Sequence, residues 1–241
     1  MQIIKADSYE EMSQKAANVI AAQVILKRNS VIGLATGSTP IRTYQFLIDH
    51  YRNHGVDFSE VTTFNLDEYK GLPADNDQSY RYFMEENLLH HINIEPSKIN
   101  FLDGMTADSI AECERYEKLI EDAGGIDVQL VGMGNNGHLA FNEPSHCFTR
   151  ISTEVRLSQS TIDANKRFFT SEDEVPRKAL TMGIGTIMKA RKIVMIVSGA
   201  NKALAAEKAF TGPICPEVPA SILQMHPDVV VFGDKEALPF M

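Results

Sequence analysis

A glycine-rich segment that ends in a histidine is the strongest candidate for chemistry in this 241-residue sequence. Residues 131–138 read Val-Gly-Met-Gly-Asn-Asn-Gly-His, and the carboxylate of Glu143 follows shortly after. His138 can titrate near neutral pH, and Glu143 could accept a hydrogen bond from its ring and set the tautomer. Asn136 can donate and accept hydrogen bonds but cannot act as a base. The pattern predicts a proton-transfer loop, and the alternative is a glycine-rich turn around a structural histidine.

The same segment matches the spacing of a dinucleotide-binding fingerprint, with glycines at positions 132, 134 and 137. A true fingerprint opens directly into a helix. Here Pro144 follows within a few residues and leaves little room for one. The segment is also far from the first strand–helix turn. We therefore do not expect a nicotinamide cofactor.

Two neighbouring acids, Asp67 and Glu68, follow a predicted strand over residues 61–66. Acids at a strand end are common as a solvated turn or a helix cap. The functional alternative is that Asp67 faces the site and moves a proton. Side-chain alternation along the strand does not decide which of the two acids points inward.

A third group is suited to binding an anion. Gly37, Ser38 and Thr39 join a predicted strand over 31–35 to a predicted helix over 40–54. Free N–H groups of a first helical turn attract anions, and the two hydroxyls add donors, so the loop suits a phosphate. The glycine is not followed by lysine, which excludes a nucleotide P-loop. The alternative is a tight turn in which Thr39 caps the helix.

Two basic residues could complete such an anion site. Arg167 lies in the stretch after residue 151, and Lys202 follows the predicted strand over 192–198. An arginine can bind a phosphate with two parallel hydrogen bonds, whereas a lysine acts as a point charge. Taken singly, most lysines and arginines are solvated surface residues, so both stay candidates at this point.

The elements that must position these residues alternate regularly. Ser8 and Glu11 have the spacing of a capping box that opens a helix. We predict strands over residues 31–35, 61–66, 127–133, 192–198 and 229–232, and helices after Ser8 and over 40–54, 79–91, 109–123 and 201–210. This alternation predicts one α/β domain of three layers, α/β/α, around a mostly parallel, Rossmann-like sheet. Ligands bind beyond the carboxyl ends of such strands, so we expect the candidate residues to meet there.

Composition limits the possible partners. The net charge of −9 argues against binding to nucleic acid or to an anionic membrane surface, both of which need a basic surface. Three scattered cysteines without a CxxC pair favour a reduced compartment and give no zinc-finger spacing. The sequence shows neither a signal peptide nor an apolar run that could span a membrane, so we expect a cytoplasmic protein without metal or cofactor.

Three stretches resemble the glucosamine-6-phosphate deaminase family. They are residues 34–40 (Leu-Ala-Thr-Gly-Ser-Thr-Pro), 64–69 (Phe-Asn-Leu-Asp-Glu-Tyr) and 132–144, which begins Gly-Met-Gly-Asn-Asn-Gly-His and is close to the family signature. Shorter matches at 163–169, 179–183 and 199–203 extend the resemblance over nearly the whole chain, in order and without large insertions.

The resemblance implies a reaction and a division of roles. It implies conversion of glucosamine 6-phosphate and water to fructose 6-phosphate and ammonia, without metal or cofactor. His138, held by Glu143, would relay a proton during ring opening, and Asp67 would carry a proton from C2 to C1. Gly37, Ser38, Thr39, Arg167 and Lys202 would hold the phosphate. The stretch 151–175 matches the mobile lid of the family.

Two features depart from that family pattern. Position 136 is Asn where some members have Asp, so we expect Glu143 alone to orient the histidine, with Asn136 as a supporting hydrogen-bonding group. The sequence ends soon after Gly233, whereas allosterically activated members have longer tails, so we expect little allosteric activation. The oligomeric state, monomer or homo-oligomer, stays open.

Related activities on the same fold are the competing interpretations. A galactosamine-6-phosphate isomerase would differ only in contacts to the C4 hydroxyl group. A 6-phosphogluconolactonase would need no base at C2. A sugar-phosphate-sensing domain of a transcription regulator would carry an appended helix-turn-helix and tend to lose the catalytic acids, which this sequence keeps.

Overall fold

A parallel sheet forms the centre of the computed structural model, which describes residues 1–159, 162, 169 and 174–241. Within these residues the strand order is β1-β10-β9-β6-β2-β3-β5, and every pair of neighbours is parallel. The strands are β1 (Gln2–Ala6), β2 (Val31–Leu34), β3 (Thr62–Asn65), β5 (Ile99–Asn100), β6 (Val128–Gly132), β9 (Lys192–Val197) and β10 (Val229–Asp234). The predicted α/β class with a mostly parallel sheet is confirmed.

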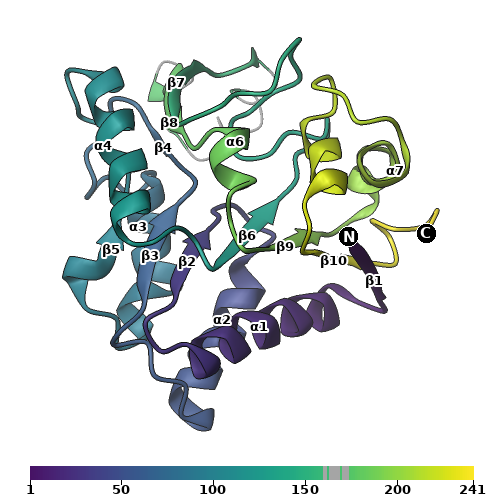
Figure 1. Cartoon of the computed structure of the whole chain (residues 1–241), viewed down its shortest axis with the longest axis horizontal. Coiled ribbons are helices and arrows are strands. Elements are labelled where there is room, and N and C mark those ends of the chain that lie inside the picture. The colour runs from purple at the N-terminus through teal and green to yellow at the C-terminus, as the bar shows by residue number, and fades with distance from the viewer. Residues whose placement is uncertain (160–161, 163–168, 170–173) are drawn as a thin grey trace.

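Helices cover both faces of this sheet (Figure 1). They are α1 (Tyr9–Leu26), α2 (Ile41–His54), α3 (Tyr80–Asn87), α4 (Ser109–Asp122), α6 (Ile184–Ile187) and α7 (Ala203–Thr211), with 3-10 turns at Leu89–His91, Pro96–Lys98, Ala200–Lys202 and Pro219–Met225. Successive strand residues belong to different cores. Ile32 packs in a cluster with α1, α2 and α3, whereas Val31 packs in a cluster with α4, α6 and α7.

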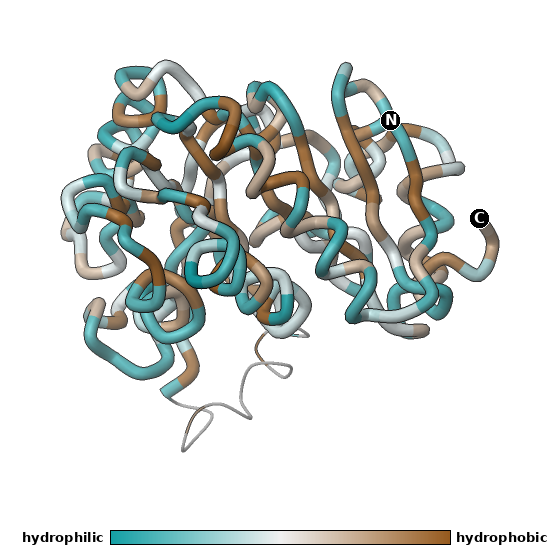
Figure 2. Tube along the Cα trace, turned by 90° about the horizontal axis from the view of Figure 1, so that it is seen from below, coloured by the Kyte–Doolittle hydropathy of each residue, from teal (hydrophilic) through white to brown (hydrophobic). Residues whose placement is uncertain are grey.

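Strands buried on both faces explain why their sequences are continuously apolar. Figure 2 shows the strands as mostly hydrophobic tubes among helices of mixed character. The resulting three layers match the predicted arrangement. Among the described residues, no helix is both long enough and apolar enough to cross a lipid bilayer.

A second, antiparallel sheet lies beside the first, in the strand order β4-β8-β7. It consists of β4 (Asp67–Tyr69), β7 (Thr153–Arg156) and β8 (Lys178–Thr181). We expected Asp67–Tyr69 as a loop, and this expectation is wrong because the segment pairs with β8. The stretch 151–175, expected as a lid, begins with β7, and much of its remainder lies outside the described residues.

Most predicted boundaries hold to within a few residues. Ser8 caps α1 and accepts a hydrogen bond from the Glu11 amide at 3.1 Å, which is one half of the predicted capping box. The Glu11 carboxylate accepts from the Asp7 amide rather than from that of Ser8, so the other half differs from the prediction. The predicted helix over 79–91 is instead α3 followed by a 3-10 turn. The strands missed in the large sheet, β1 and β5, lie at its edges, where half-exposed residues give a weaker apolar signal.

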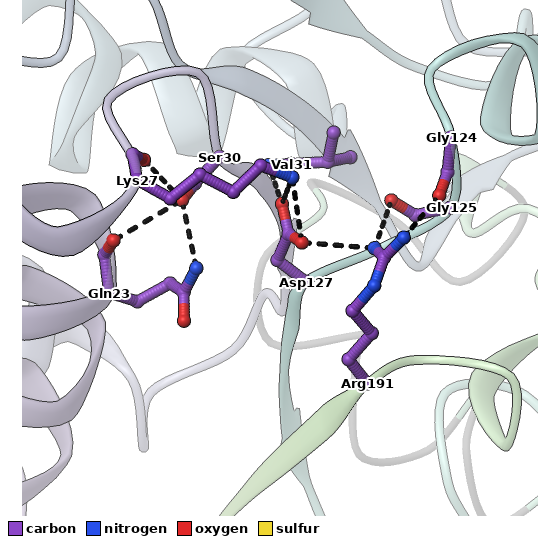
Figure 3. A network of polar contacts seen from close by, with 8 residues as sticks. All are labelled: Gln23, Lys27, Ser30, Val31, Gly124, Gly125, Asp127 and Arg191. Atoms are coloured by element: carbon purple, nitrogen blue, oxygen red, sulfur yellow. Dashed lines mark hydrogen bonds and ion pairs between the residues drawn. The ribbon is translucent and has the colours of Figure 1, made fainter.

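A buried ion cluster joins the amino-terminal ends of β2 and β6 (Figure 3). Asp127, only 4% exposed, accepts hydrogen bonds from Lys27 at 2.7 and 2.9 Å and from Arg191 at 2.9 Å. It also accepts a hydrogen bond from the Val31 amide at 2.8 Å. The cluster therefore fixes α1, β2 and β6 relative to one another. It lies at the amino-terminal ends of the strands, opposite the ends that carry the candidate site residues.

Candidate active site

The large sheet extends in opposite directions from its two central strands, β2 and β6. From β2 the sheet continues to β3 and β5, and from β6 it continues to β9, β10 and β1. At such a reversal the loops after the two central strands diverge and leave a crevice for a ligand. Three of the predicted groups follow β2, β3 and β6. Because these strands are parallel, the topology brings the three groups together at the carboxyl ends of the strands.

Asp67 is a buried acid whose carboxylate is incompletely paired. Its side chain is 5% exposed, and its Oδ1 atom is buried without a hydrogen-bond partner among the described residues. Burial raises the pKa of Asp67 well above its ordinary value, and the charge of Glu68 adds to the effect. An unpaired carboxylate with a raised pKa is a stronger base than a solvated one, which suits it to accept a proton from carbon.

Glu68 has a structural task instead. Its carboxylate accepts hydrogen bonds from the backbone amides of Tyr69 at 2.8 Å, Tyr80 at 2.9 Å and Arg81 at 2.9 Å. Two of these amides belong to the first turn of α3, whose N–H groups have no partner within the helix. Glu68 thus caps a helix, whereas Asp67 has a buried oxygen atom without a hydrogen-bond partner among the described residues, which favours Asp67 as the candidate base.

The loop after β6 arranges Asn136, His138 and Glu143 in one group. The Nδ1 atom of His138 lies 3.5 Å from Oε1 of Glu143, longer than a usual hydrogen bond but close enough for one after a small rotation. Asn136 donates to the other oxygen of Glu143 at 2.7 Å and accepts from the His138 amide at 3.2 Å. Asn136 therefore links the carboxylate to the histidine, as a supporting hydrogen-bonding group.

Glycine is required in this loop by close packing. A Cβ atom on Gly134 would lie 2.1 Å from the ring of His138, so any side chain there would displace the imidazole. Gly134 is therefore explained by the position of the histidine ring, whereas Gly137 has a φ of +86°, a conformation that favours glycine. No helix follows directly, and Leu139 and Asn142 form an isolated bridge, which agrees with the prediction from Pro144.

One residue of the second sheet lies beside both this loop and Asp67. Thr181 on β8 is the ladder partner of Asp67. Its Oγ1 atom accepts a hydrogen bond from the amide of Phe141 at 3.2 Å. The histidine loop and the buried acid are thus held to the same strand. Thr181 was missed in the sequence, which has no local signal for an antiparallel partner 114 positions from Asp67.

The loop after β2 begins with a glycine whose backbone conformation other residues rarely adopt. Gly37 has a φ of +99°, a conformation that favours glycine. The N-cap of α2 is Pro40, so the predicted capping role of Thr39 is wrong. Among the described residues, the hydrogen bonds of Ser38 and Thr39 use their backbone carbonyls and leave the hydroxyl groups available.

Tyr44 connects this loop to the acid. Its fully buried hydroxyl group donates to the carbonyl of Ala35 and accepts from the Ala35 amide at 3.1 Å. Burial raises the pKa of Tyr44, and the nearby charge of Asp67 raises it further. The start of the anion loop and the buried acid therefore lie within electrostatic reach of each other.

Of the two predicted basic residues, the structure describes Lys202 but not Arg167. Lys202 follows β9, is partly buried and has no ion pair with a described residue, and burial lowers its pKa. A desolvated ammonium group without a counter-ion gains stability from a bound anion. The neighbouring Asn201 donates to Asn135 at 3.0 Å and so ties this loop to the loop after β6. Arg167 lies outside the described residues, and its role stays a prediction.

A cavity of about 230 Å³ lies elsewhere, at the β5 edge of the sheet. Its lining includes Glu68, Phe101 and the side chains of Arg81 and Arg115, but none of the predicted site residues. Both arginines already pair with glutamates on their own helices. The candidate active site is therefore the set of loops at the carboxyl ends of the central strands, where the strand order reverses.

Comparisons with known proteins show the family of the chain. The family model for glucosamine-6-phosphate isomerases and 6-phosphogluconolactonases matches residues 5–232. The chain belongs to this family. Within it, the chain is 54% identical to a glucosamine-6-phosphate deaminase of Lachnoclostridium phytofermentans, over 96% of this chain and 98% of the relative. It is 52% identical to one of Halothermothrix orenii, over 98% of both chains.

Solved structures of the family separate into near and distant relatives. A monomeric glucosamine-6-phosphate deaminase of the NagB superfamily superposes with a TM-score of 0.96 at 43% identity, covering 98% of both chains. A 6-phosphogluconolactonase from Trypanosoma brucei has a TM-score of 0.79 at 22% identity, covering 98% of this chain and 97% of that one, and shows the shared fold alone. The resemblance predicted from the three motifs is confirmed.

Proposed function

We propose that this protein is a glucosamine-6-phosphate deaminase, which converts glucosamine 6-phosphate and water to fructose 6-phosphate and ammonia. The observation that carries the proposal is the buried, incompletely paired carboxylate of Asp67 beside an anion-binding loop. A lactone hydrolase needs no base of this kind, whereas an isomerisation that moves a proton between carbon atoms does. The high identity to proteins of this name supports the same choice.

In the proposed mechanism the phosphate group provides orientation. Gly37, Ser38 and Thr39 bind it through backbone N–H groups and hydroxyls, and Lys202 and Arg167 supply positive charge. These contacts are remote from the reacting carbons. Their binding energy holds the sugar so that C1 and C2 face Asp67, which replaces a random encounter with a fixed geometry.

Ring opening is assigned to the loop after β6. His138 passes a proton between the C1 hydroxyl and the ring oxygen, which breaks the bond between that oxygen and C1 and yields the open aldehyde. Glu143 stabilises the protonated imidazole, and Asn136 fixes the carboxylate through its 2.7 Å hydrogen bond. Ser158, whose hydroxyl lies 3.3 Å from Glu143, adds a second hydrogen bond to that carboxylate.

Asp67 then performs the isomerisation. Its carboxylate removes the proton from C2, a C1–C2 double bond forms as the C1 carbonyl double bond breaks, and the C1 oxygen takes up a proton to give an enolamine. The same carboxyl group returns the proton to C1, and the nitrogen gives up a proton as the imine forms at C2. Water adds to the imine carbon, and ammonia departs to give the ketone of fructose 6-phosphate. A raised pKa suits Asp67 to both steps, because it must accept and then release a proton.

The proposal extends to cellular context. All three cysteines are free in the structure, as expected in a reducing compartment. We therefore propose a cytoplasmic enzyme of amino-sugar breakdown that acts on a small sugar phosphate. We further propose that the chain forms one catalytic domain and that residues 151–175 close over the bound sugar.

Product analysis on three substrates tests the proposal. Purified protein without added metal is given glucosamine 6-phosphate, galactosamine 6-phosphate or 6-phosphogluconolactone. We expect ammonia and fructose 6-phosphate from the first substrate at a much higher kcat/KM than any turnover of the other two. Preferential turnover of the galactosamine compound would change the sugar assigned here. Lactone hydrolysis without ammonia release would overturn the deaminase proposal.

A further inference from the structure

The first turn of α1 reaches the anion-binding loop through Tyr9. The hydroxyl oxygen of Tyr9 lies 3.2 Å from the carbonyl oxygen of Ser38 and 3.0 Å from that of Thr39, and its proton is donated to both. The same oxygen accepts a hydrogen bond from the Arg42 amide at 3.2 Å. One hydroxyl group from outside the loop thus bonds to two of its carbonyls and to the first turn of α2.

These contacts replace a helix cap that the sequence cannot provide locally. The N-cap residue of α2 is Pro40, which has no side-chain hydrogen-bonding group. A helix normally satisfies one or more of its first N–H groups with an N-cap side chain. Here the amide of Arg42, the second residue of α2, is satisfied by Tyr9, so the cap comes from another helix.

The position of Tyr9 is itself fixed. Ser8 caps α1 through the Glu11 amide, and Glu11 accepts a hydrogen bond from the Asp7 amide at 2.7 Å. One residue after Tyr9, Glu10 forms a bidentate ion pair with Arg42, with one bond of 2.6 Å. The hydroxyl group of Tyr9 is therefore held by a capped helix end and a second link to α2.

We propose that Tyr9 is a positioning residue for substrate binding, which sets the anion-binding loop in the orientation that receives the phosphate group. Carbonyl oxygens repel a phosphate, whereas N–H and hydroxyl groups attract it. By binding the carbonyls of Ser38 and Thr39, Tyr9 keeps them directed toward itself and leaves the donors of the loop for the anion. This inference rests on the proposed function only in taking the anion to be the substrate phosphate.

The consequence is confined to binding. Tyr9 touches neither Asp67 nor the histidine loop through any hydrogen bond of the described residues. Loss of its hydroxyl should therefore weaken the hold on the phosphate without changing the proton transfers. Tyr9→Phe is a suitable variant because the ring packs against the hydrophobic core and is retained.

The test compares Tyr9→Phe with Tyr51→Phe as a matched control. Tyr51 lies on α2, packs against the same core, and its hydroxyl has no hydrogen bond to a described residue. We expect Tyr9→Phe to raise KM about three- to tenfold, as loss of a hydrogen bond does, with kcat changed less than about twofold. The inhibition constant of inorganic phosphate should rise in parallel, and Tyr51→Phe should match the wild type.

Two outcomes would overturn the inference. One is an unchanged KM and an unchanged phosphate inhibition constant in Tyr9→Phe. The other is a fall in kcat at constant KM, which would assign Tyr9 to the chemical steps. If the wild type releases no ammonia, the proposed function fails separately. Calorimetric titration of inorganic phosphate into the wild type and Tyr9→Phe then still tests the role of Tyr9.

Discussion

Two aspartates beyond opposite ends of the parallel strands are buried to nearly the same extent and have contrasting surroundings. Asp127, 4% exposed, precedes β6 and accepts hydrogen bonds from Lys27, Arg191 and the Val31 amide (Figure 3). Asp67, 5% exposed, follows β3 and has a buried oxygen atom without a partner among the described residues. A buried carboxylate normally needs such partners, because desolvation of a charge is costly.

The two ends of the parallel strands therefore differ: the aspartate at the amino ends supports the fold, and the aspartate at the carboxyl ends is the candidate for function. At the amino-terminal edge the charge of Asp127 is matched by two cations, so the group contributes to the fold. At the carboxyl-terminal ends of the strands, Asp67 has a raised pKa and a buried oxygen atom without a partner among the described residues, so its charged form destabilises the fold. Unfavourable local arrangements of this kind are characteristic of functional sites.

The largest expected effect is that of Asp67→Asn on turnover. An amide has the shape of the carboxyl group but cannot accept a proton from carbon, so kcat should fall by about 10²- to 10⁴-fold. KM should change little because the phosphate contacts are retained. Steady-state ammonia release measures both constants. Turnover that survives the substitution would move the base to another residue, although Glu68 is already engaged in capping α3.

The same substitution at the other aspartate provides the matched control. Asp127→Asn should leave kcat within about twofold of the wild type but lower the free energy of unfolding by about 1.5–3 kcal/mol, the range for a hydrogen bond to a charged group. A larger loss is not expected, because the side chains of Lys27 and Arg191 are 41% and 58% exposed and can be hydrated. Urea unfolding measures it, and equal stability of both proteins would contradict a structural role for the cluster.

This contrast shows which features could be predicted from sequence. The buried strands β2, β6 and β9 were found because both of their faces are apolar, and alternation with helices then determined the fold class. The candidates His138 and Lys202 were selected because they follow predicted strands, and the structure places both of them after strands. The glycine spacing around His138 matches a dinucleotide fingerprint by itself. It could be interpreted as a proton-transfer loop only because no helix was predicted directly after it.

Other features depend on contacts between distant segments and leave no local pattern. The antiparallel pairing of Asp67 with Thr181 made a strand out of a predicted loop. The capping of α3 by Glu68 and the contact of Tyr9 with Ser38 likewise join residues from separate elements. Nothing in the residues beside the two aspartates indicates that Asp67 has a buried oxygen atom without a partner among the described residues, whereas Asp127 has three partners.

A smaller effect concerns how stability depends on pH. Burial, with a further contribution from Glu68, raises the pKa of Asp67 in the folded protein. The unfolded chain loses this proton near pH 4, whereas the folded protein retains it to higher pH. Folding then takes up a proton, so the free energy of unfolding falls as pH rises from about 4 to the folded pKa of Asp67.

Asp67→Asn removes this titration. The free energy of unfolding of the variant, minus that of the wild type, should grow with pH within that window and become constant above it. Urea unfolding at a series of pH values measures the difference, and contributions from groups common to both proteins cancel. Two curves that stay parallel from pH 4 to neutrality would mean that the carboxylate of Asp67 is not destabilised by its surroundings.

The smallest expected effect is that of Glu68→Gln on the pH profile of turnover. Because burial comes first and the charge of Glu68 second among the causes of the raised pKa of Asp67, removing that charge should lower this pKa only in part. The acidic limb of kcat should then move to lower pH, since the base stays deprotonated further into acid. Glu112→Gln, at a buried glutamate that pairs with Arg115, is the matched control and should leave the limb in place. If the acidic limb stays in place in both variants, burial alone would account for the raised pKa of Asp67.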